Sequence, residues 1–260
     1  MGERERYEPG TFSWADLSTT DQAAAKEFYG ALLGWEADDQ PVDDQGTVYS
    51  MMRVGGRAVA AISPQPEAMA AAGAPPAWNS YVTVASADEA AAKAAALGGT
   101  VAMEPFDVFD AGRMAGLLDP QGAFVLVWEP REHIGAQMVN APGALMWNEL
   151  STGDIDAAAG FYGELFGWEI QETRPEPERY LAILNGDARN GGIRGATPPD
   201  FPPHWLVYFA VEDLDAAMAR AGELGGAVHA GPIDIGPGRL AVVADPQGAF
   251  FALYEGQMDP

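Results

Sequence analysis

Two short stretches of the sequence pair an indole with a carboxyl group two residues further on. Trp14 is followed by Asp16, and Trp147 is followed by Glu149. In a β-strand, side chains two positions apart point to the same side. An indole offers a flat face to aromatic or cationic ligands, and a partly buried carboxylate can accept a proton or a hydrogen bond. The alternative is structural, with the indole in the core and the acid holding a backbone amide or an arginine.

Both pairs open a segment that the chain contains twice. Residues 14–35 read WADLSTTDQAAAKEFYGALLGW and residues 147–168 read WNELSTGDIDAAAGFYGELFGW, with shared residues displaced by the same 133 positions. The segments that begin at Trp78 and Trp205 repeat at an offset of 127, and GRMAGLLDPQGAF returns as GRLAVVADPQGAF at an offset of 126. The repeat unit is therefore a whole domain of about 125 residues.

Alternation and capping signals indicate the elements of each unit. Residues 11–17 alternate as a strand, with Phe12, Trp14 and Asp16 on one face. Ser18 to Asp21 supply N-cap chemistry for a helix that ends near Leu33. The order β-α-β-β-β follows four times along the chain. We expect domains at 11–130 and 143–256, a linker at 131–142, and a loose polar arm at 1–10.

The composition limits the class of partner. The chain has 14 basic and 38 acidic residues and a formal net charge of -24, so nucleic acid and membrane surfaces are unlikely partners. It has no cysteine, which excludes a disulfide framework or a thiolate site. The N-terminal stretch MGERERYEPG lacks the apolar run of a secretory signal. We expect a cytoplasmic protein that is a monomer with an internal pseudo-dimer, or a homodimer.

The paired modules, the FYG and LGW motifs at the end of one helix, the LGG stop of the next and the strand after DPQGA resemble the vicinal oxygen chelate superfamily. This superfamily includes glyoxalase, bleomycin-resistance and extradiol dioxygenase proteins, and the chain looks most like its tandem actinobacterial type. The resemblance implies an α+β fold in which four βαβββ modules form two open, cup-shaped sheets, with a ligand in the cup. DPQG is expected to be a turn and LGG a helix stop.

Enzymes of this superfamily usually hold a divalent metal with His, Glu or Gln side chains from the first and last strands of the modules. Only Asn79 is a possible ligand, and a weak one, among the matching positions, and the three histidines include His133 in the linker. We therefore predict that neither cup needs a metal or another cofactor. The matching positions are Trp14, Asn79 or its neighbour Trp78, and Leu126 in the first domain, and Trp147, Leu206 and Ala252 in the second.

Aromatic and polar side chains occupy the positions expected to face each cup. His204 lies beside Trp205 at the mouth of a module, where it could reach a ligand or be a satisfied surface histidine. Arg113 and Arg239 occupy matching positions before the last turn, and the alternative for them is a pairing with Asp16 or Glu149. The candidate ligand-binding residues are Trp14, Tyr49, Trp78, Asn79, Tyr81, Arg113, Trp147, Tyr180, His204, Trp205, Tyr208 and Arg239.

Three functions remain open. The first is a binding module that sequesters a small aromatic or apolar metabolite, in natural-product resistance or biosynthesis. The second is a metal-independent enzyme of the lyase, isomerase or hydroxylase type, with Asp16 or Glu149 as the general base after burial raises its pKa. In the third, one cup is functional and the other is a structural partner. Metal-dependent glyoxalase or dioxygenase activity is disfavoured by the missing ligands.

Overall fold

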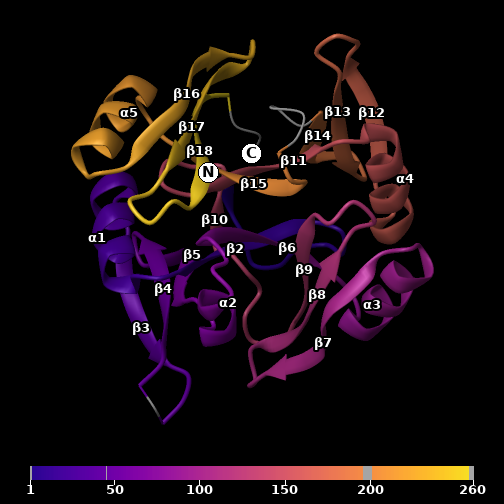
Figure 1. The fold of residues 1–260 in the computed structure, drawn as a ribbon, viewed down its shortest axis with the longest axis horizontal. Helices are drawn as coiled ribbons and strands as arrows, with labels where there is room; N and C mark the ends of the chain where they lie inside the picture. Colours follow the sequence, from indigo (N-terminus) through magenta and orange to yellow (C-terminus); the bar gives the residue numbers. More distant parts are fainter. Residues whose placement is uncertain (1, 45, 196–200, 258–260) are drawn as a thin grey trace.

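The computed structural model describes residues 2–44, 46–195 and 201–257. Each half of the chain forms its own curved sheet, so the expected fold is confirmed (Figure 1). The sheet of the first half has the order β3-β4-β5-β2-β6-β9-β8-β7. Its strands are β2 (Phe12–Thr19), β3 (Glu36–Pro41), β4 (Val48–Val54), β5 (Arg57–Pro64), β6 (Ala77–Thr83), β7 (Thr100–Val108), β8 (Gly112–Leu118) and β9 (Phe124–Pro130).

The sheet of the second half repeats this order as β12-β13-β14-β11-β15-β18-β17-β16. The two first strands therefore have matching neighbours, because β2 lies between β5 and β6 and β11 lies between β14 and β15. The strands are β11 (Leu145–Thr152), β12 (Glu169–Arg174), β13 (Tyr180–Asn185), β14 (Ala188–Gly195), β15 (His204–Ala210), β16 (Ala227–Asp234), β17 (Gly238–Ala244) and β18 (Phe250–Gly256).

Helices flank the two sheets at both sides of the molecule. In Figure 1, α1 lies beside α5 on one flank and α3 beside α4 on the other, and both pairs are in contact. The N-cap prediction holds for α1, since the Asp21 carboxylate accepts a hydrogen bond from the amide of Ala24 and Gly34 ends the helix at φ 72°. The helices are α1 (Gln22–Leu33), α2 (Glu67–Ala71), α3 (Ala87–Ala96), α4 (Ile155–Phe166) and α5 (Leu214–Glu223). No helix in the described ranges is long and apolar enough to cross a membrane.

The arm and the linker are more ordered than expected. The arm forms β1 (Gly2–Glu3), which pairs with β10 (Met138–Val139) of the linker, and β10 in turn pairs with β11. The linker also fills a gap between β2 and β5, because Ala136 donates its amide to the carbonyl of Ser13 and Gln137 donates to Ala58. Free strand-edge groups of the first sheet are thereby satisfied.

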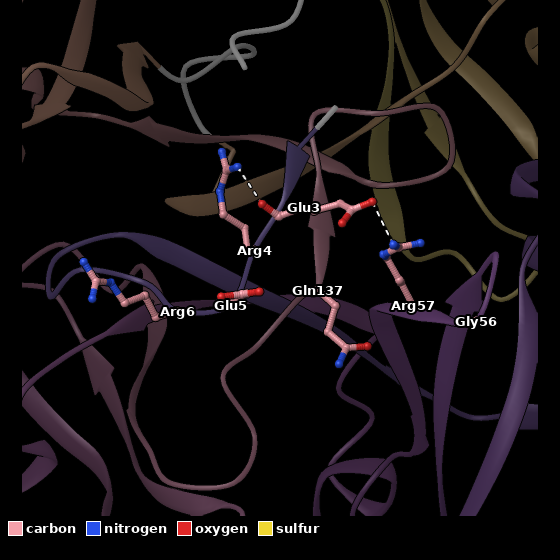
Figure 2. A pocket seen from close by; sticks show the side chains of 7 residues that line it. All are labelled: Glu3, Arg4, Glu5, Arg6, Gly56, Arg57 and Gln137. Carbon is pink, nitrogen blue, oxygen red and sulfur yellow. Dashed lines mark hydrogen bonds and ion pairs between the residues drawn. The ribbon is translucent and has the colours of Figure 1, made fainter.

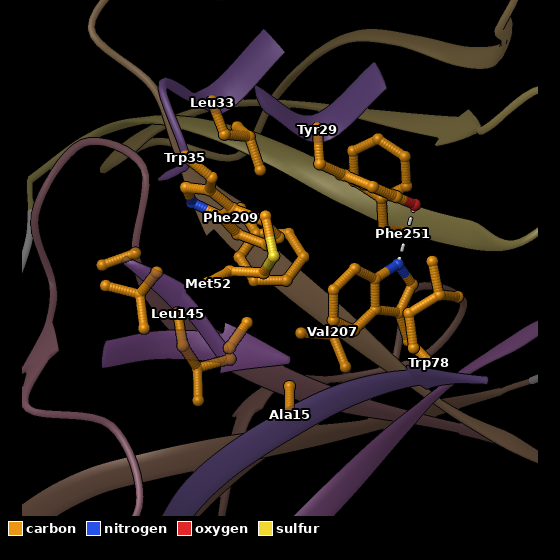
Figure 3. Close-up of a cluster of buried hydrophobic side chains, with 14 of the residues drawn as sticks. Ala15, Tyr29, Leu33, Trp35, Met52, Trp78, Leu145, Val207, Phe209 and Phe251 are labelled. Carbon is orange, nitrogen blue, oxygen red and sulfur yellow. Dashed lines mark hydrogen bonds between the residues drawn. The ribbon is translucent and has the colours of Figure 1, made fainter. Parts of the chain in front are cut away.

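The two sheets pack against each other through an apolar core contributed by both halves. Figure 3 shows Trp35 and Trp78 of the first half among Phe209 and Phe251 of the second. The ring of Phe209 lies 5.1 Å from that of Trp35 and 4.9 Å from that of Trp78. Aromatic pairs at this separation add to the burial energy, so the two halves share a packed core and are not joined by the linker alone.

A bulge corrects one prediction about the first strand. The pairing of β2 with β6 shifts between Phe12 and Trp14, so these two side chains do not share a face as expected. Phe12 instead packs into the interface between the halves, 5.4 Å from the ring of Trp168 and 5.0 Å from that of Trp205. The extra residue of a bulge reverses the alternation of side chains.

The LGW motifs connect the halves reciprocally. Trp35 donates its indole N–H to the carbonyl of Gly143 at 2.6 Å, and Trp168 donates to the carbonyl of Gly10 at 2.6 Å. Trp168 follows Trp35 by 133 positions, and Gly143 follows Gly10 by the same 133 positions. The two contacts are therefore related by a pseudo-two-fold axis. Each half therefore caps the entry strand of the other.

The FYG and DPQG motifs meet across the same interface. The hydroxyl of Tyr29 donates to a carboxyl oxygen of Asp245 at 3.1 Å and accepts the indole N–H of Trp78 at 2.9 Å. In the matching place, Trp205 donates to the hydroxyl of Tyr162 at 3.1 Å. These tyrosines are fully buried, so the motifs hold the halves together in addition to forming turns.

The second glycine of each LGG motif also serves the interface. A Cβ on Gly99 would lie 3.0 Å from Cζ of Phe161 in the other half, and a Cβ on Gly226 would lie 3.0 Å from Cε2 of Phe28. A helix stop alone would not require this space. The glycines admit the phenylalanines of the opposite FYG motifs.

Candidate functional site

The face of each sheet that is turned away from the other half is called a cup here. In the first cup, Asp16 of β2 collects three hydrogen bonds. Its Oδ2 accepts from the hydroxyls of Tyr81 at 2.6 Å and Tyr49 at 3.2 Å, and its Oδ1 accepts from the amide of Asn79 at 2.8 Å. The Tyr49 hydroxyl accepts the indole N–H of Trp14 at 3.0 Å. Five predicted site residues thus form one network.

The second cup contains the matching network around Glu149 of β11. The indole N–H of Trp147 donates to the hydroxyl of Tyr180 at 3.0 Å. Glu149 interacts with the hydroxyls of Tyr180 and Tyr208, and Nη1 of Arg194 lies 3.8 Å from its Oε1. Each cup therefore holds a tryptophan, two tyrosines and one carboxyl group.

Burial controls the ionisation of both carboxyl groups. It raises the pKa of Asp16 above the usual range, and the hydrogen bonds from Tyr81, Asn79 and Tyr49 oppose this only in part. Burial likewise raises the pKa of Glu149, and the positive charge of Arg194 is the largest opposing effect. A carboxylate with a raised pKa is a stronger base than an exposed one, so either group could accept a proton from a ligand.

The linker covers the first cup with His133. Its imidazole lies edge-on to Trp14, with ring centres 4.6 Å apart, and its carbonyl accepts the indole N–H of Trp128 at 2.8 Å. Burial lowers the pKa of His133 to about 4, with a smaller contribution from the charge of Arg53. Its Nε2 is buried and has no hydrogen-bond partner among the described residues. Trp14 is consequently only 3% exposed.

The position of His133 against Trp14 is not predictable from the sequence. It lies in the linker, outside both repeat units, and has no counterpart in the second half. A residue of the linker is not expected to reach a cup, yet His133 lies against the Trp14 indole. The one feature of the sequence that could have drawn attention to His133 is that the chain contains only 3 histidines.

The second cup is more open. Trp147 is half-buried, in contrast to the buried Trp14. The guanidinium of Arg174 lies over the ring of Tyr180, 5.0 Å from its centre, and Arg194 approaches Glu149 from β14. Neither Arg174 nor Arg194 was among the predicted site residues, because the sequence did not show which strands they neighbour.

Five predicted ligand-binding residues lie outside these networks. Trp78 and Trp205 belong to the core between the halves, where they donate to tyrosine hydroxyls. They follow the opposite alternation from Asn79 and Leu206, whose strand partners are Asp16 and Glu149. The remaining three are Arg113, Arg239 and His204.

The suggested pairing of Arg113 and Arg239 with the cup acids is wrong. Arg113 forms ion pairs with Asp88 and Asp107 at the surface. Arg239 pairs with Asp215 and Glu255, so neither guanidinium balances Asp16 or Glu149.

His204 lies at the edge of the second cup. Its Nδ1 is 2.9 Å from the carbonyl of Pro202, and its ring is 4.9 Å from that of Phe201. Burial lowers the pKa of His204, and the charge of Arg194 contributes to this. The imidazole is therefore a neutral polar group beside Arg194.

The donor set of the cups does not fit a divalent metal. Strand pairing places Trp14 beside Tyr81 and Tyr81 beside Leu126 in the first cup. Trp14 and Leu126 are two of the positions at which the resemblance implies metal ligands. Within the described ranges, no three His, Cys, Asp or Glu side chains come together in a group that could hold a metal ion. Imidazole and carboxylate ligands must converge at about 2 Å from the ion, and in the described part of the chain neither Asp16 nor Glu149 belongs to such a group.

A separate cavity lies beside the N-terminal arm and shares no lining residue with either network. It has a volume of about 760 Å³ and is lined by charged residues of the arm together with Arg57 and Gln137 (Figure 2). Glu3 forms an ion pair with Arg57 at 2.7 Å across it. Its lining has no aromatic side chain, so it differs in chemistry from the cups.

Comparison with known proteins identifies the family. A model of the Glyoxalase/Bleomycin resistance protein/Dioxygenase superfamily matches residues 11–127 and again residues 144–253. The chain is 47% identical over 257 residues to a Mycobacterium bovis protein named "Putative glyoxylase CFP32", covering 98% of both chains. It is 36% identical over 266 residues to "Anthracycline biosynthesis protein DnrV" of Streptomyces peucetius, covering 96% of this chain and 94% of that protein.

A solved structure shares the fold. The Mn(II)-bound glyoxalase from Novosphingobium aromaticivorans aligns with a TM-score of 0.66 at 15% sequence identity, covering 98% of this chain and 83% of that one. The family model falls once on each half, in agreement with the two sheets. The chain therefore belongs to the glyoxalase/bleomycin resistance/dioxygenase superfamily, as a protein with two tandem glyoxalase domains.

Proposed function

We propose that this protein binds a small aromatic metabolite without a metal, and that the second cup receives it. The observation that carries the proposal is the partly exposed indole of Trp147, held by Tyr180 beside the buried acid Glu149. A fixed indole provides a stacking surface, and a carboxyl group and tyrosine hydroxyls provide the few polar contacts that orient a ligand.

The first cup supports the same chemistry but is closed in this structure. Its Trp14 is buried beneath His133, and Asp16 already accepts three hydrogen bonds. A ligand could reach Asp16 only if the linker moved. The first cup therefore serves as the structural partner of the second.

The names of two relatives agree with an aromatic ligand. DnrV of Streptomyces peucetius and DauV of a Streptomyces strain are both named anthracycline biosynthesis proteins, with 36% and 35% identity to this chain. Anthracyclines are fused-ring aromatic compounds, a class that stacks well on an indole.

A titration with quinizarin, a planar dihydroxyanthraquinone, tests this proposal. Wild-type protein is expected to bind it saturably, and Trp147→Ala is expected to weaken binding about tenfold, the typical loss when an aromatic stacking partner is removed. Trp147→Phe retains a ring and serves as the matched control. Absence of saturable binding, or equal affinity in Trp147→Ala and wild type, would contradict a ligand site in the second cup.

A second function, general-base catalysis, is favoured by the raised pKa of Glu149. Glu149→Gln retains the shape of the side chain and removes the base. If the protein is an enzyme, this variant binds its substrate but turns it over at least about a hundredfold more slowly. If wild type turns over no bound compound, the protein is a binding module.

A further inference from the structure

We propose that the second cup selects ligands that carry an acidic group, and that Arg174 and Arg194 recognise this group. The inference rests on the proposed ligand site in the second cup and adds the chemical class of the ligand. It concerns an aromatic acid, such as a carboxylate, a sulfonate or an ionised phenol, rather than a neutral aromatic compound.

The pairing of strands aligns the two arginines in one row across the second cup. Arg174 of β12 lies opposite Tyr180 of β13, and Tyr180 lies opposite Arg194 of β14. The row continues through Ser151 of β11 to His204 of β15. Directly paired residues point to the same face of a sheet. Arg194 is two residues from the strand partner of Glu149, so the row lies on the cup face.

The first cup lacks positive charge in the same row. Its members, taken from the repeat and the strand pairing, are Gln40, Tyr49, Ser63, Ser18 and Ala77. The tyrosine and the β2 or β11 serine are common to both rows. Both arginines and the histidine are thus specific to the second cup. The first cup has the same fold with neutral residues at these positions, so the fold itself does not require the arginines.

The charges in the second cup favour an anion. Among the described residues, the positive charges of Arg174 and Arg194 both act on the buried acid Glu149, while His204 is neutral because burial lowers its pKa. The Arg194 side chain is 44% exposed and the Glu149 side chain only 9% exposed, so a ligand meets the arginine first. This concentration of positive charge stands out in a chain with a net charge of -24.

The stacking surface and the cations are close enough for one small molecule. The Tyr180 hydroxyl accepts the indole N–H of Trp147, and the same Tyr180 ring lies under the guanidinium of Arg174. A ring on Trp147 would place its acidic substituent beside the arginines. Guanidinium groups bind carboxylate and sulfonate oxygens in paired, charge-assisted hydrogen bonds.

Two fluorescent probes of matched shape test this inference. Anilinonaphthalene sulfonate carries an acidic group, and N-phenylnaphthylamine is its neutral counterpart. Wild-type protein is expected to bind the sulfonate at least about tenfold more tightly. Arg174→Gln and Arg194→Ser install the first-cup residues, and each is expected to weaken sulfonate binding about five- to tenfold without changing the affinity for the neutral probe.

Two controls separate the possible failures. Arg57→Ser removes an arginine from the cavity beside the arm, and it should not change sulfonate binding. If Arg57→Ser weakens binding while Arg174→Gln and Arg194→Ser do not, the acidic group is bound elsewhere and the inference is wrong. The inference is also wrong if both probes bind equally and respond only to Trp147→Ala, a result that leaves the proposed ligand site intact. If Trp147→Ala affects neither probe, the ligand site itself fails. Thermal unfolding of each variant checks that it is folded.

Discussion

The hydroxyl of Tyr81 lies 2.6 Å from Oδ2 of Asp16, and both side chains are buried. This contact belongs to a cup in which neutral donors alone surround a carboxyl group. In the second cup the matching acid, Glu149, has the guanidinium of Arg194 at 3.8 Å. One duplicated scaffold therefore holds two acids in different electrostatic surroundings.

The raised pKa of Asp16 predicts a pH-dependent stability. The folded state binds the Asp16 proton more tightly than the unfolded chain does, so this group costs stability as the pH rises from the ordinary aspartate pKa of about 4 towards the raised value. Asp16→Asn is therefore expected to gain stability relative to wild type as the pH increases. Urea unfolding of both proteins across this range measures the difference. Glu67→Gln on α2 removes an exposed carboxyl group as a control. A wild-type to Asp16→Asn difference that is constant with pH would contradict the raised pKa.

Tyr81→Phe tests the shortest hydrogen bond of the first cup. It removes a donor from a buried carboxyl group and is expected to lower the free energy of unfolding by about 1–3 kcal/mol. The pKa of Asp16 should rise further, because the Tyr81 hydrogen bond is the largest effect that lowers it. Tyr49→Phe, which removes a longer contact of 3.2 Å, is the comparison. An equal or larger loss in Tyr49→Phe would show that Tyr81 does not dominate the network.

The lowered pKa of His133 predicts that the packing of this residue over the first cup becomes less stable in acid. Its pKa is about 4 in the folded protein and about 6.5 in an unfolded chain, so the unfolded chain binds the proton first as the pH falls. The stability contribution of His133 is therefore present above about pH 6.5 and is lost as the pH falls towards about 4. His133→Phe keeps a ring against Trp14 and should remove this part of the pH dependence. His229→Gln, an exposed histidine, should leave it unchanged. A His133 imidazole that titrates near pH 6.5 in an NMR experiment would overturn this assignment.

Two glycine substitutions test the interface between the halves. Gly99→Ala would place a Cβ 2.8 Å from the carbonyl oxygen of Leu118 and 3.0 Å from Phe161, and it is expected to cost about 1–3 kcal/mol of stability. Gly160→Ala in α4 meets no heavy atom within 4 Å, and it is expected to stabilise the protein by about 0.5–1 kcal/mol. Calorimetric unfolding measures both. A neutral Gly99→Ala would mean that the close approach of Phe161 and Leu118 does not require a glycine at this position, since the left-handed residue that ends α3 is Gly98.

Strand periodicity made part of the candidate site predictable. Trp14 and Asp16 share a cup, as do Trp147 and Glu149, because alternation within one strand is visible in the sequence. The sequence left Asn79 and its neighbour Trp78 as alternatives for one cup position, and the strand pairing places Asn79, not Trp78, opposite Asp16. A shift of one residue moves a side chain to the other face, and the sequence does not contain the register between strands.

The sequence by itself determined the duplication, the family fold and the position of the acid in each cup, because these depend on local patterns and on a repeat of constant offset. Only the tertiary structure decided how distant segments meet. It placed His133 over Trp14, brought Arg194 to Glu149, and joined Trp35 to Gly143 across the halves. Each of these contacts joins residues that are far apart in the chain. They depend on the register between strands and on how the two similar sheets pack, and local sequence patterns contain neither.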